Sequence, residues 1–265
     1  MSVPGASSSV DIEAKHPSLM SSAAVLLRLT WVRTASPMLV VAIVALVLLP
    51  MAFAVIFASR GPMSGDAVQF LVQRYDQLVL ALATPLIALL LGTSAFTAEA
   101  EDGTLLYLVT TTTPRWWIAI VRVLFAATLT GVLSALAILG TGYPVHGPYD
   151  QDGVTRAFAV AVCYGGAVYA ACFTALALIT KRALVVGLGY VLFWEGILSA
   201  TFPGIDYLSV RQWMLAVASS LTDVIDPRLN AGPSAKVAIV GGAILVLSAV
   251  TLSARRLREP RTGRI

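Results

Sequence analysis

Residues 37–58 read PMLVVAIVALVLLPMAFAVIFA and contain no charged side chain. With a rise of ~1.5 Å per residue, a helix of this length exceeds ~30 Å and is long enough to cross a bilayer. Further apolar runs follow in the 265-residue chain, which is 58% hydrophobic and 12% charged, with a mean hydropathy of +0.84. Because backbone groups inside hydrocarbon must bond within their own segment, the spans are expected to be helices. The sequence therefore predicts an all-α membrane protein.

Working outward from this run, we expect six spans. They cover residues 37–58, 77–98, 116–141, 156–179, 183–201 and 237–254. Pro50 and Pro85 are expected to kink the first two, since proline removes a helical hydrogen bond. A short helix is expected before Asp76, and residues 142–154 have the composition of a loop. Residues 209–221 are expected to form a helix too polar and too short to cross, either a re-entrant gate or an interfacial cover on the outer side.

The two ends of the chain differ from the spans. Residues 1–17 are rich in Ser, Pro and Gly without periodicity, which predicts a disordered tail. The apolar positions of residues 18–34 follow helical spacing, which is typical of an amphipathic helix on the membrane surface or of an extension of the first span. Residues 257–265 form a basic tail. The remaining segment, 18–256, is expected to be one membrane domain.

The basic residues indicate how the chain is oriented. Six spans place both termini on one side, and of the 18 Lys and Arg residues 12 lie on that side and 6 on the other. The excess of basic residues marks the cytosolic side of a plasma-membrane protein. The net charge of +4 and the pI near 9.3 arise from these span ends, so no nucleic-acid partner is indicated. Arg outnumbers Lys 15 to 3, which favours a GC-rich bacterial genome.

Residues that bind metals or nucleotides are sparse. Cys163 and Cys172 lie nine positions apart on one predicted helix and point to opposite faces, so neither a disulfide nor a shared metal site fits. His16 and His146 lie in a tail and a loop away from any acidic or Cys cluster, so no metal site is predicted. The chain also lacks a G-x-x-x-x-G-K-[ST] loop. We expect it to bind no cofactor and to catalyse no reaction itself.

A dense polar stretch separates the second and third spans. Residues 97–122 read TAEAEDGTLLYLVTTTTPRWWIAIVR. Glu99, Glu101 and Asp102 follow a span directly on the predicted cytosolic side, where bases are usual. These acids are either solvated charges or form ion pairs with Arg115 and Arg122 that make the connection between the two spans more rigid. Residues 104–112 have an apolar face of Leu and Val, which is typical of a short surface helix suited to dock a soluble partner.

The same stretch resembles the coupling segment of permeases in the type-2 (export) family of ABC transporters. That family has E-x-E-x-G-T-L after its second span, then a Leu-rich turn, P-x-S-R and a basic residue seven positions later. The matching residues here are Glu99, Glu101, Gly103, Thr104, Leu105, Arg115 and Arg122. The proline departs from the pattern: the family places it where this chain has Thr112, whereas here it is Pro114.

The resemblance implies a permease of the exporter fold. Two permease subunits, identical or different, would pair, and each would dock a separate ATPase subunit through residues 104–112 and the amphipathic helix. ATP and Mg²⁺ would bind to the ATPase, whose closure would rock the permeases to switch access across the membrane. The substrate stays open among an apolar drug or antibiotic, a lipid and a peptide. A role in maturing a metal site, as in the nitrous-oxide reductase accessory permease, is a further option.

Glu195 is the charged residue expected well inside the hydrocarbon. It lies about 12 residues, or ~18 Å, from the cytosolic start of its span, where an ionised carboxylate costs ~2.5–3.5 kcal/mol unless it meets water or a partner. With Trp194 it lies either on the translocation path or at the seam between permeases, or it is structural, paired with a neighbouring span or lifted toward the outer interface. Gly187-x-Gly189, earlier in this span, indicates helix packing.

Two classes of function therefore remain. The first is the transport permease, and the second is a membrane scaffold or an intramembrane enzyme. An enzyme would need convergent polar groups in its spans, such as a His and Asp cluster or a Ser with a base, and one glutamate is too few. A scaffold would leave residues 97–122 without a purpose. A neighbouring gene for a Walker-motif ATPase distinguishes transport from the other class.

Overall fold

The computed structural model describes residues 28, 36–59, 67–101, 114–146, 153–198, 205–223 and 232–256, with the backbone alone for 95–101, 115, 197, 198, 205 and 206. Every element in this part of the chain is a helix, as predicted. Four predictions concern segments outside it: the tail 1–17, the amphipathic helix 18–34 apart from Arg28, the surface helix 104–112 and the basic tail 257–265.

The helices follow the apolar runs of the sequence. In chain order they are α2 (Pro37–Ala58), α3 (Ala67–Arg74), η1 (Tyr75–Ala83), α4 (Thr84–Glu101), α6 (Arg115–His146), α7 (Val154–Ile179), α8 (Ala183–Tyr190), η2 (Val191–Leu198), η3 (Ile205–Leu208), α10 (Val210–Ser219) and α11 (Ala235–Arg256). α3, η1 and α4 are continuous, and η1 and η2 are π-helical, with turns wider than those of an α-helix. η3 is a short 3₁₀ turn.

Five stretches of the described chain are long and apolar enough to cross a membrane. They are Pro37–Ala58, Ala67–Ser94, Trp116–His146, Val154–Ile179 and Ala235–Arg256. These stretches indicate a multi-pass membrane protein. Ala183–Gly196 is apolar but shorter, and residues 199–204 lie outside the described ranges, so the predicted fifth span, 183–201, stays a prediction. The short helix expected before Asp76 is confirmed as α3.

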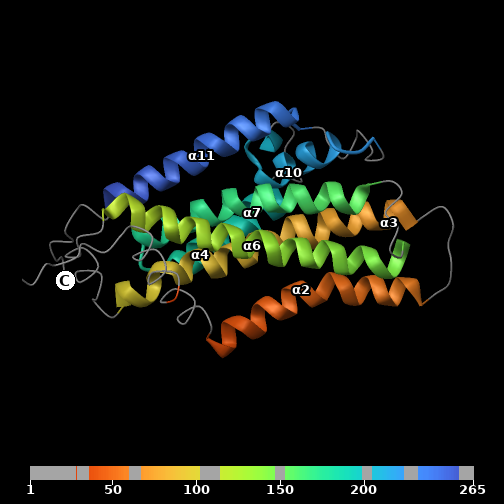
Figure 1. Ribbon diagram of the computed structural model, residues 1–265, viewed down its shortest axis with the longest axis horizontal. Coiled ribbons are helices and arrows are strands. Elements are labelled where there is room, and N and C mark those ends of the chain that lie inside the picture. Colours follow the sequence, from red (N-terminus) through yellow and green to blue (C-terminus); the bar gives the residue numbers. More distant parts are fainter. Residues whose placement is uncertain are drawn as a thin grey trace, which may run out of the picture.

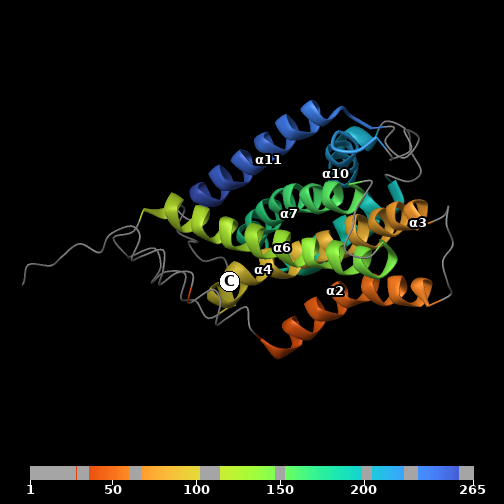
Figure 2. The ribbon, with the colours of Figure 1, turned by 45° about the vertical axis from the view of Figure 1, so that its right-hand side comes forward.

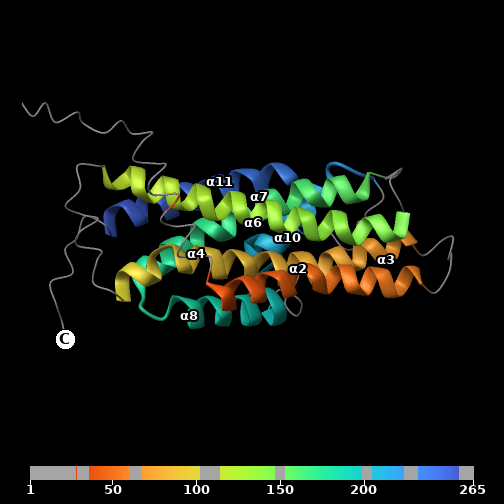
Figure 3. The same cartoon turned by 60° about the horizontal axis from the view of Figure 1, so that its bottom comes forward.

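The helices form a bundle around α7 (Figure 1). α7 packs against α4, α6, α10 and α11, and α2 and α11 lie on opposite sides of the bundle. In the most apolar part of α7, 67% of the residues are buried inside the protein, against 17% in α2 and 22% in α11. α10 lies between α11 and α7 (Figure 2), and α8 lies beside α2 and α4 (Figure 3). α2 and α11 are therefore the helices most open to lipid or to another subunit.

Glycines allow the central helices to cross closely. A Cβ atom on Gly166 of α7 would lie 3.1 Å from Thr130 Cγ2 and 3.3 Å from the backbone nitrogen of Gly131, both on α6. Such small residues let backbones approach in membrane bundles. In the predicted packing pair, a Cβ on Gly187 would lie 3.3 Å from the ring of Phe173, whereas nothing lies within 4 Å of Gly189. The packing role is confirmed for Gly187, and at Gly189 it stays a prediction, because no described residue lies close to it.

The predicted loop at 142–154 is partly wrong, because α6 continues through His146. Tertiary contacts override the Gly and Pro turn signal here. The Tyr75 hydroxyl lies 3.2 Å from the Ile138 carbonyl oxygen and 3.0 Å from Thr155 Oγ1, and His146 Nε2 lies 2.8 Å from the same Thr155 oxygen. These bonds hold the end of α6 against α7 and η1.

The two prolines act differently. Pro50 lies inside α2, which bends along its length (Figure 1), as expected of a residue that removes a hydrogen bond and crowds the preceding turn. Pro85 is the second residue of α4, one position after Thr84, whose N–H donates to the Val79 carbonyl five residues earlier. The wide turns of η1 accommodate the proline ring, so the expected distortion near Pro85 takes the form of a π-helical segment.

Candidate functional site

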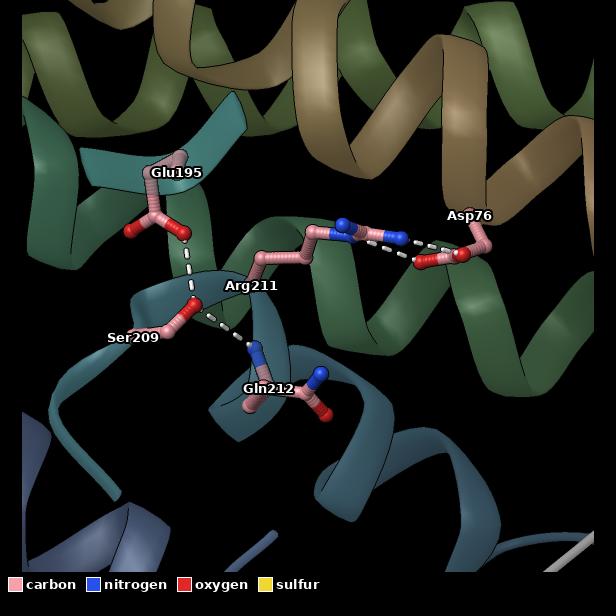
Figure 4. Close-up of polar contacts among 5 residues, drawn as sticks. All are labelled: Asp76, Glu195, Ser209, Arg211 and Gln212. Atoms are coloured by element: carbon pink, nitrogen blue, oxygen red, sulfur yellow. Dashed lines mark hydrogen bonds and ion pairs between the residues drawn. The ribbon is translucent and has the colours of Figure 1, made fainter. Parts of the chain in front are cut away.

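Glu195, in η2, meets the N-terminus of α10 inside the bundle (Figure 4). Its side chain is 0% exposed. Ser209 Oγ donates to Glu195 Oε2 at 2.6 Å, and the Val210 N–H donates to Oε1 at 3.1 Å. Ser209 is also the N-cap of α10 and accepts from the Gln212 N–H at 3.4 Å. The carboxylate thus extends the cap and lies where the helix dipole favours negative charge.

A second acid binds the same turn of α10. Arg211 donates to Asp76 through Nε to Oδ1 at 2.8 Å and through Nη2 to Oδ2 at 2.5 Å (Figure 4). The Asp76 side chain is 7% exposed and that of Arg211 is 18% exposed. Burial lowers the pKa of Arg211, but the hydrogen bonds and charge of Asp76, with the charge of Glu195, outweigh burial and place that pKa above its ordinary value. The two-pronged geometry is the strong form of an Arg–carboxylate pair.

We call these residues, Asp76, Glu195, Ser209, Val210 and Arg211, the α10 anchor. Each acid lies in a π-helical segment, Asp76 in η1 and Glu195 in η2. Such segments are frequent at functional sites in other proteins. A buried carboxylate is costly unless hydrogen bonds satisfy it, and both acids here are satisfied by three consecutive residues of one chain segment. The anchor therefore fixes where α10 begins relative to both η1 and η2.

Aromatic rings cover Glu195 on one side. Tyr169 stacks on Phe173 with centroids 5.9 Å apart, Phe173 meets Tyr190 edge-on at 6.3 Å, and Tyr190 stacks on Trp194 at 6.3 Å. The Tyr190 hydroxyl donates to Glu195 Oε1 at 3.4 Å. The indole N–H of Trp194 is buried and makes no hydrogen bond within the part of the chain that the structure describes.

The structure gives the Glu195 carboxylate hydrogen-bond partners within the protein, and two of them, Ser209 and Val210, lie at the start of the non-crossing helix α10. Trp194, predicted with it, is half-buried beside Tyr190. Across the described ranges, no group of three or more His, Cys, Asp or Glu residues is placed to hold a metal ion. The arrangement is suited to positioning a helix.

Three of the predicted coupling residues, Glu99, Glu101 and Arg115, lie at one end of the bundle. Glu99 and Glu101 form the end of α4, and Arg115 begins α6. Gly103, Thr104 and Leu105 fall outside the described residues, as do the side chains of Glu99, Glu101 and Arg115. The pairing expected between the acids and the two arginines stays a prediction. The ends of α4 and α11 and the start of α6 share this end of the molecule (Figure 1).

Pro114 and Arg122 define how α6 begins. The Pro114 carbonyl accepts from the Trp117 N–H at 2.9 Å, so this proline stands directly before the helix, where a fixed φ suits the first turn. α6 therefore begins at Arg115, directly after this proline. Arg122 is 1% exposed and lies within the bundle rather than along its outside.

The ion pair of the α10 anchor was not predicted from the sequence. Asp76 and Arg211 are separated by 135 positions. Each lies beside an apolar run, and an isolated charge at that place in a sequence usually indicates the end of a membrane span. One sequence feature could have indicated the pair: Arg211 lies in a semi-apolar segment that is too short and too polar to cross a membrane. No protein-family model matches this chain, and its sequence matches no curated protein.

Proposed function

We propose that this chain is the transmembrane permease subunit of an ATP-driven ABC exporter. In this role it pairs with a second permease subunit, identical or different, and couples to separate ATPase subunits that bind ATP and Mg²⁺. The protein lies in the plasma membrane, with both termini in the cytosol. The chain supplies the membrane path and its partners supply the hydrolysis.

The observation that carries this proposal is the position of the described ends of the polar stretch, residues 97–101 and 114–122. The acid-rich end of α4 and the start of α6 lie at the same end of the bundle as the end of α11 (Figure 1). The basic pairs Lys181–Arg182, after α7, and Arg255–Arg256, in the last turn of α11, belong to that end too. An excess of bases marks the cytosolic side, where a soluble ATPase would dock on the acid-Gly-Thr stretch.

The path of the chain supports six crossings. α7 and α11 run in the same direction along the bundle (Figure 1). A chain that links the end of α7 to the start of α11 has to return along the bundle, and we propose that residues 180–234 do so in a single crossing. α8 and η2 make the first part of that crossing, and we propose that residues 183–201 form the fifth of six spans.

An apolar groove supports pairing with a second permease. It has a volume of about 460 Å³ and lies between α2, α4 and α8. Its lining consists of Ala42, Ala45, Leu46, Leu49, Leu86, Leu89, Leu90, Leu184 and Leu188. With α2 mostly unburied by its own chain, a second subunit seated here would close a seam lined by apolar side chains, compatible with an apolar drug, a lipid or a peptide.

The proposal is tested by purifying the tagged full chain in mild detergent from its own cells and identifying its partners by mass spectrometry. We expect an ATPase subunit with a Walker phosphate-binding loop and ATP hydrolysis by the purified complex. Recovery of the intact chain without any such subunit would favour the scaffold or enzyme class instead.

A charge-reversal variant tests the coupling role. In vesicles screened with apolar drugs, lipids and peptides, the double variant Glu99→Lys, Glu101→Lys should insert and assemble but uncouple hydrolysis from export. The control is Asp223→Lys, which reverses an exposed acid beyond the end of α10 and should behave as wild type. Wild-type transport-stimulated ATPase activity in the double variant would remove the coupling role from these acids.

A further inference from the structure

Arg74, the last residue of α3, lies in a cradle of aromatic rings. Its guanidinium carbon is 5.3 Å from the ring centroid of Phe70 on the same helix and 5.7 Å from that of Phe53 on α2. Phe70 also stacks on Phe57 of α2, with centroids 3.7 Å apart and ring planes 9° apart. Rings at these distances attract a cation and fix the plane of the guanidinium.

No acid in the part of the chain that the structure describes forms an ion pair with the guanidinium of Arg74. Arg74 Nε is buried and makes no hydrogen bond in the part of the chain that the structure describes. The nearest acid in sequence, Asp76, has both carboxylate oxygens engaged by Arg211. Because aromatic faces supply attraction but no hydrogen-bond acceptor of oxygen type, the N–H donors of Arg74 still require a partner.

The location of Arg74 indicates where that partner comes from. Phe53 lies five positions before Ala58, the end of α2, which places the guanidinium about 7 Å inside the end of an apolar helix. The neighbouring α2 side chains face outward: Phe53 is 43% exposed and Ile56 is 53% exposed. A cation at this depth against a lipid-facing surface extends toward the headgroups, where phosphates are the available anions.

We propose that Arg74 and its aromatic cradle bind the phosphate of a phospholipid. The planar guanidinium donates two N–H bonds to the phosphate oxygens, while the acyl chains lie along the exposed apolar face of α2. A phosphate in this position pairs with a guanidinium that no acid of the described ranges neutralises. An anionic lipid such as phosphatidylglycerol suits the site best, since its headgroup has no ammonium group to compete with Arg74.

Native mass spectrometry of the full chain in detergent tests the ligand class. Phosphatidylglycerol, uncharged diacylglycerol and inorganic phosphate are titrated separately onto the wild-type chain. We expect phosphatidylglycerol to bind about tenfold more tightly than diacylglycerol, and inorganic phosphate not to displace it. Equal binding of the two lipids would overturn the proposal, because acyl chains alone would explain it. Displacement by inorganic phosphate would overturn the lipid assignment in favour of a soluble anion.

Variants test the residue. Arg74→Gln should bind phosphatidylglycerol about tenfold more weakly, and Arg74→Lys should lie between it and the wild type, since lysine keeps the charge but not the planar fork. The matched control, Lys236→Gln, removes an exposed charge at the start of α11 and should change the affinity by about twofold or less. Wild-type affinity in a folded Arg74→Gln variant would also overturn the proposal. If that variant does not fold, the comparison of ligands on the wild-type chain still decides.

Discussion

Arg211 forms a two-pronged ion pair with Asp76, which lies 135 positions earlier in the chain. The pair joins the first turn of a helix that does not cross the bundle to the π-helical part of one that does. Its neighbour Ser209 bonds Glu195 at the same time, so one turn of α10 satisfies two buried acids. These contacts give the most direct tests of the structure.

Removing one partner of the ion pair should destabilise the fold strongly. Asp76→Asn leaves the largely buried guanidinium of Arg211 without its counter-charge, at a cost of about 3–5 kcal/mol in the free energy of unfolding. The double variant Asp76→Leu, Arg211→Met should recover most of this loss, because it leaves no buried charge. Denaturant unfolding in detergent measures both, and Asp223→Asn, an exposed acid, should change stability by less than about 0.5 kcal/mol. Equal stability of Asp76→Asn and wild type would contradict the observed pairing.

Loss of the N-cap hydroxyl should loosen α10. Ser209→Ala removes the donor to Glu195 Oε2 at 2.6 Å and the cap of the helix, for an expected cost of about 1–3 kcal/mol. Ser220→Ala is the matched control, because that hydroxyl bonds only the Val217 carbonyl in its own helix. Hydrogen exchange of α10 amides should rise in the first variant and not in the second. Similar exchange in both variants would mean that Glu195 does not depend on Ser209.

A bulky side chain at the crossing of α6 and α7 should not fit. Gly166→Leu would press against Thr130 and the backbone of Gly131, and overpacking of this kind costs about 1–3 kcal/mol or more. Gly189→Leu makes the same chemical change where nothing lies within 4 Å. Thermal unfolding in detergent should show a lower midpoint for the first variant alone. Matching midpoints would place the crossing elsewhere.

The polar contact at the end of α6 should stabilise the helical form of residues 142–146. Thr155→Val keeps the shape of the side chain but removes the oxygen shared by Tyr75 and His146, for an expected cost of about 1 kcal/mol. Thr128→Val is the control, since its exposed hydroxyl bonds only the Leu124 carbonyl one turn earlier. Amide exchange of residues 142–146 distinguishes the two. Unchanged protection there in Thr155→Val would show that the helix persists without the contact.

Much of the fold follows from composition and length. The bounds of α2 coincide with the first predicted span, and α7 and α11 lie within two residues of theirs at each end, because uninterrupted apolar runs specify helices in a membrane. The turn signal at Gly142 and Pro144 misled because contacts with Thr155 and Tyr75 outweigh it. Local sequence does not record such contacts.

The candidate site was predictable only in part. Glu195 stands out because a lone carboxylate in an apolar run is costly, and it is indeed satisfied by hydrogen bonds. Its partners in α10 and the pairing of Asp76 with Arg211 depend on where a non-crossing helix folds back. The π-helical turns of η1 and η2 also change which side chains share a face, so counting by 3.6 residues per turn does not bring these groups together.

The first turn of α10 acts as a mechanical joint between two π-helical segments of the bundle. Ser209 and Arg211 are two positions apart on one rigid turn, yet they bind acids from η2 and η1 respectively. If η1 and η2 separate, α10 must stay with one of them and break its contact with the other. The acid that loses its partner, Asp76 or Glu195, is then exposed to water, whereas both are buried in the closed bundle. A motion that opens the bundle between these segments therefore has to break one of the two sets of contacts that α10 makes.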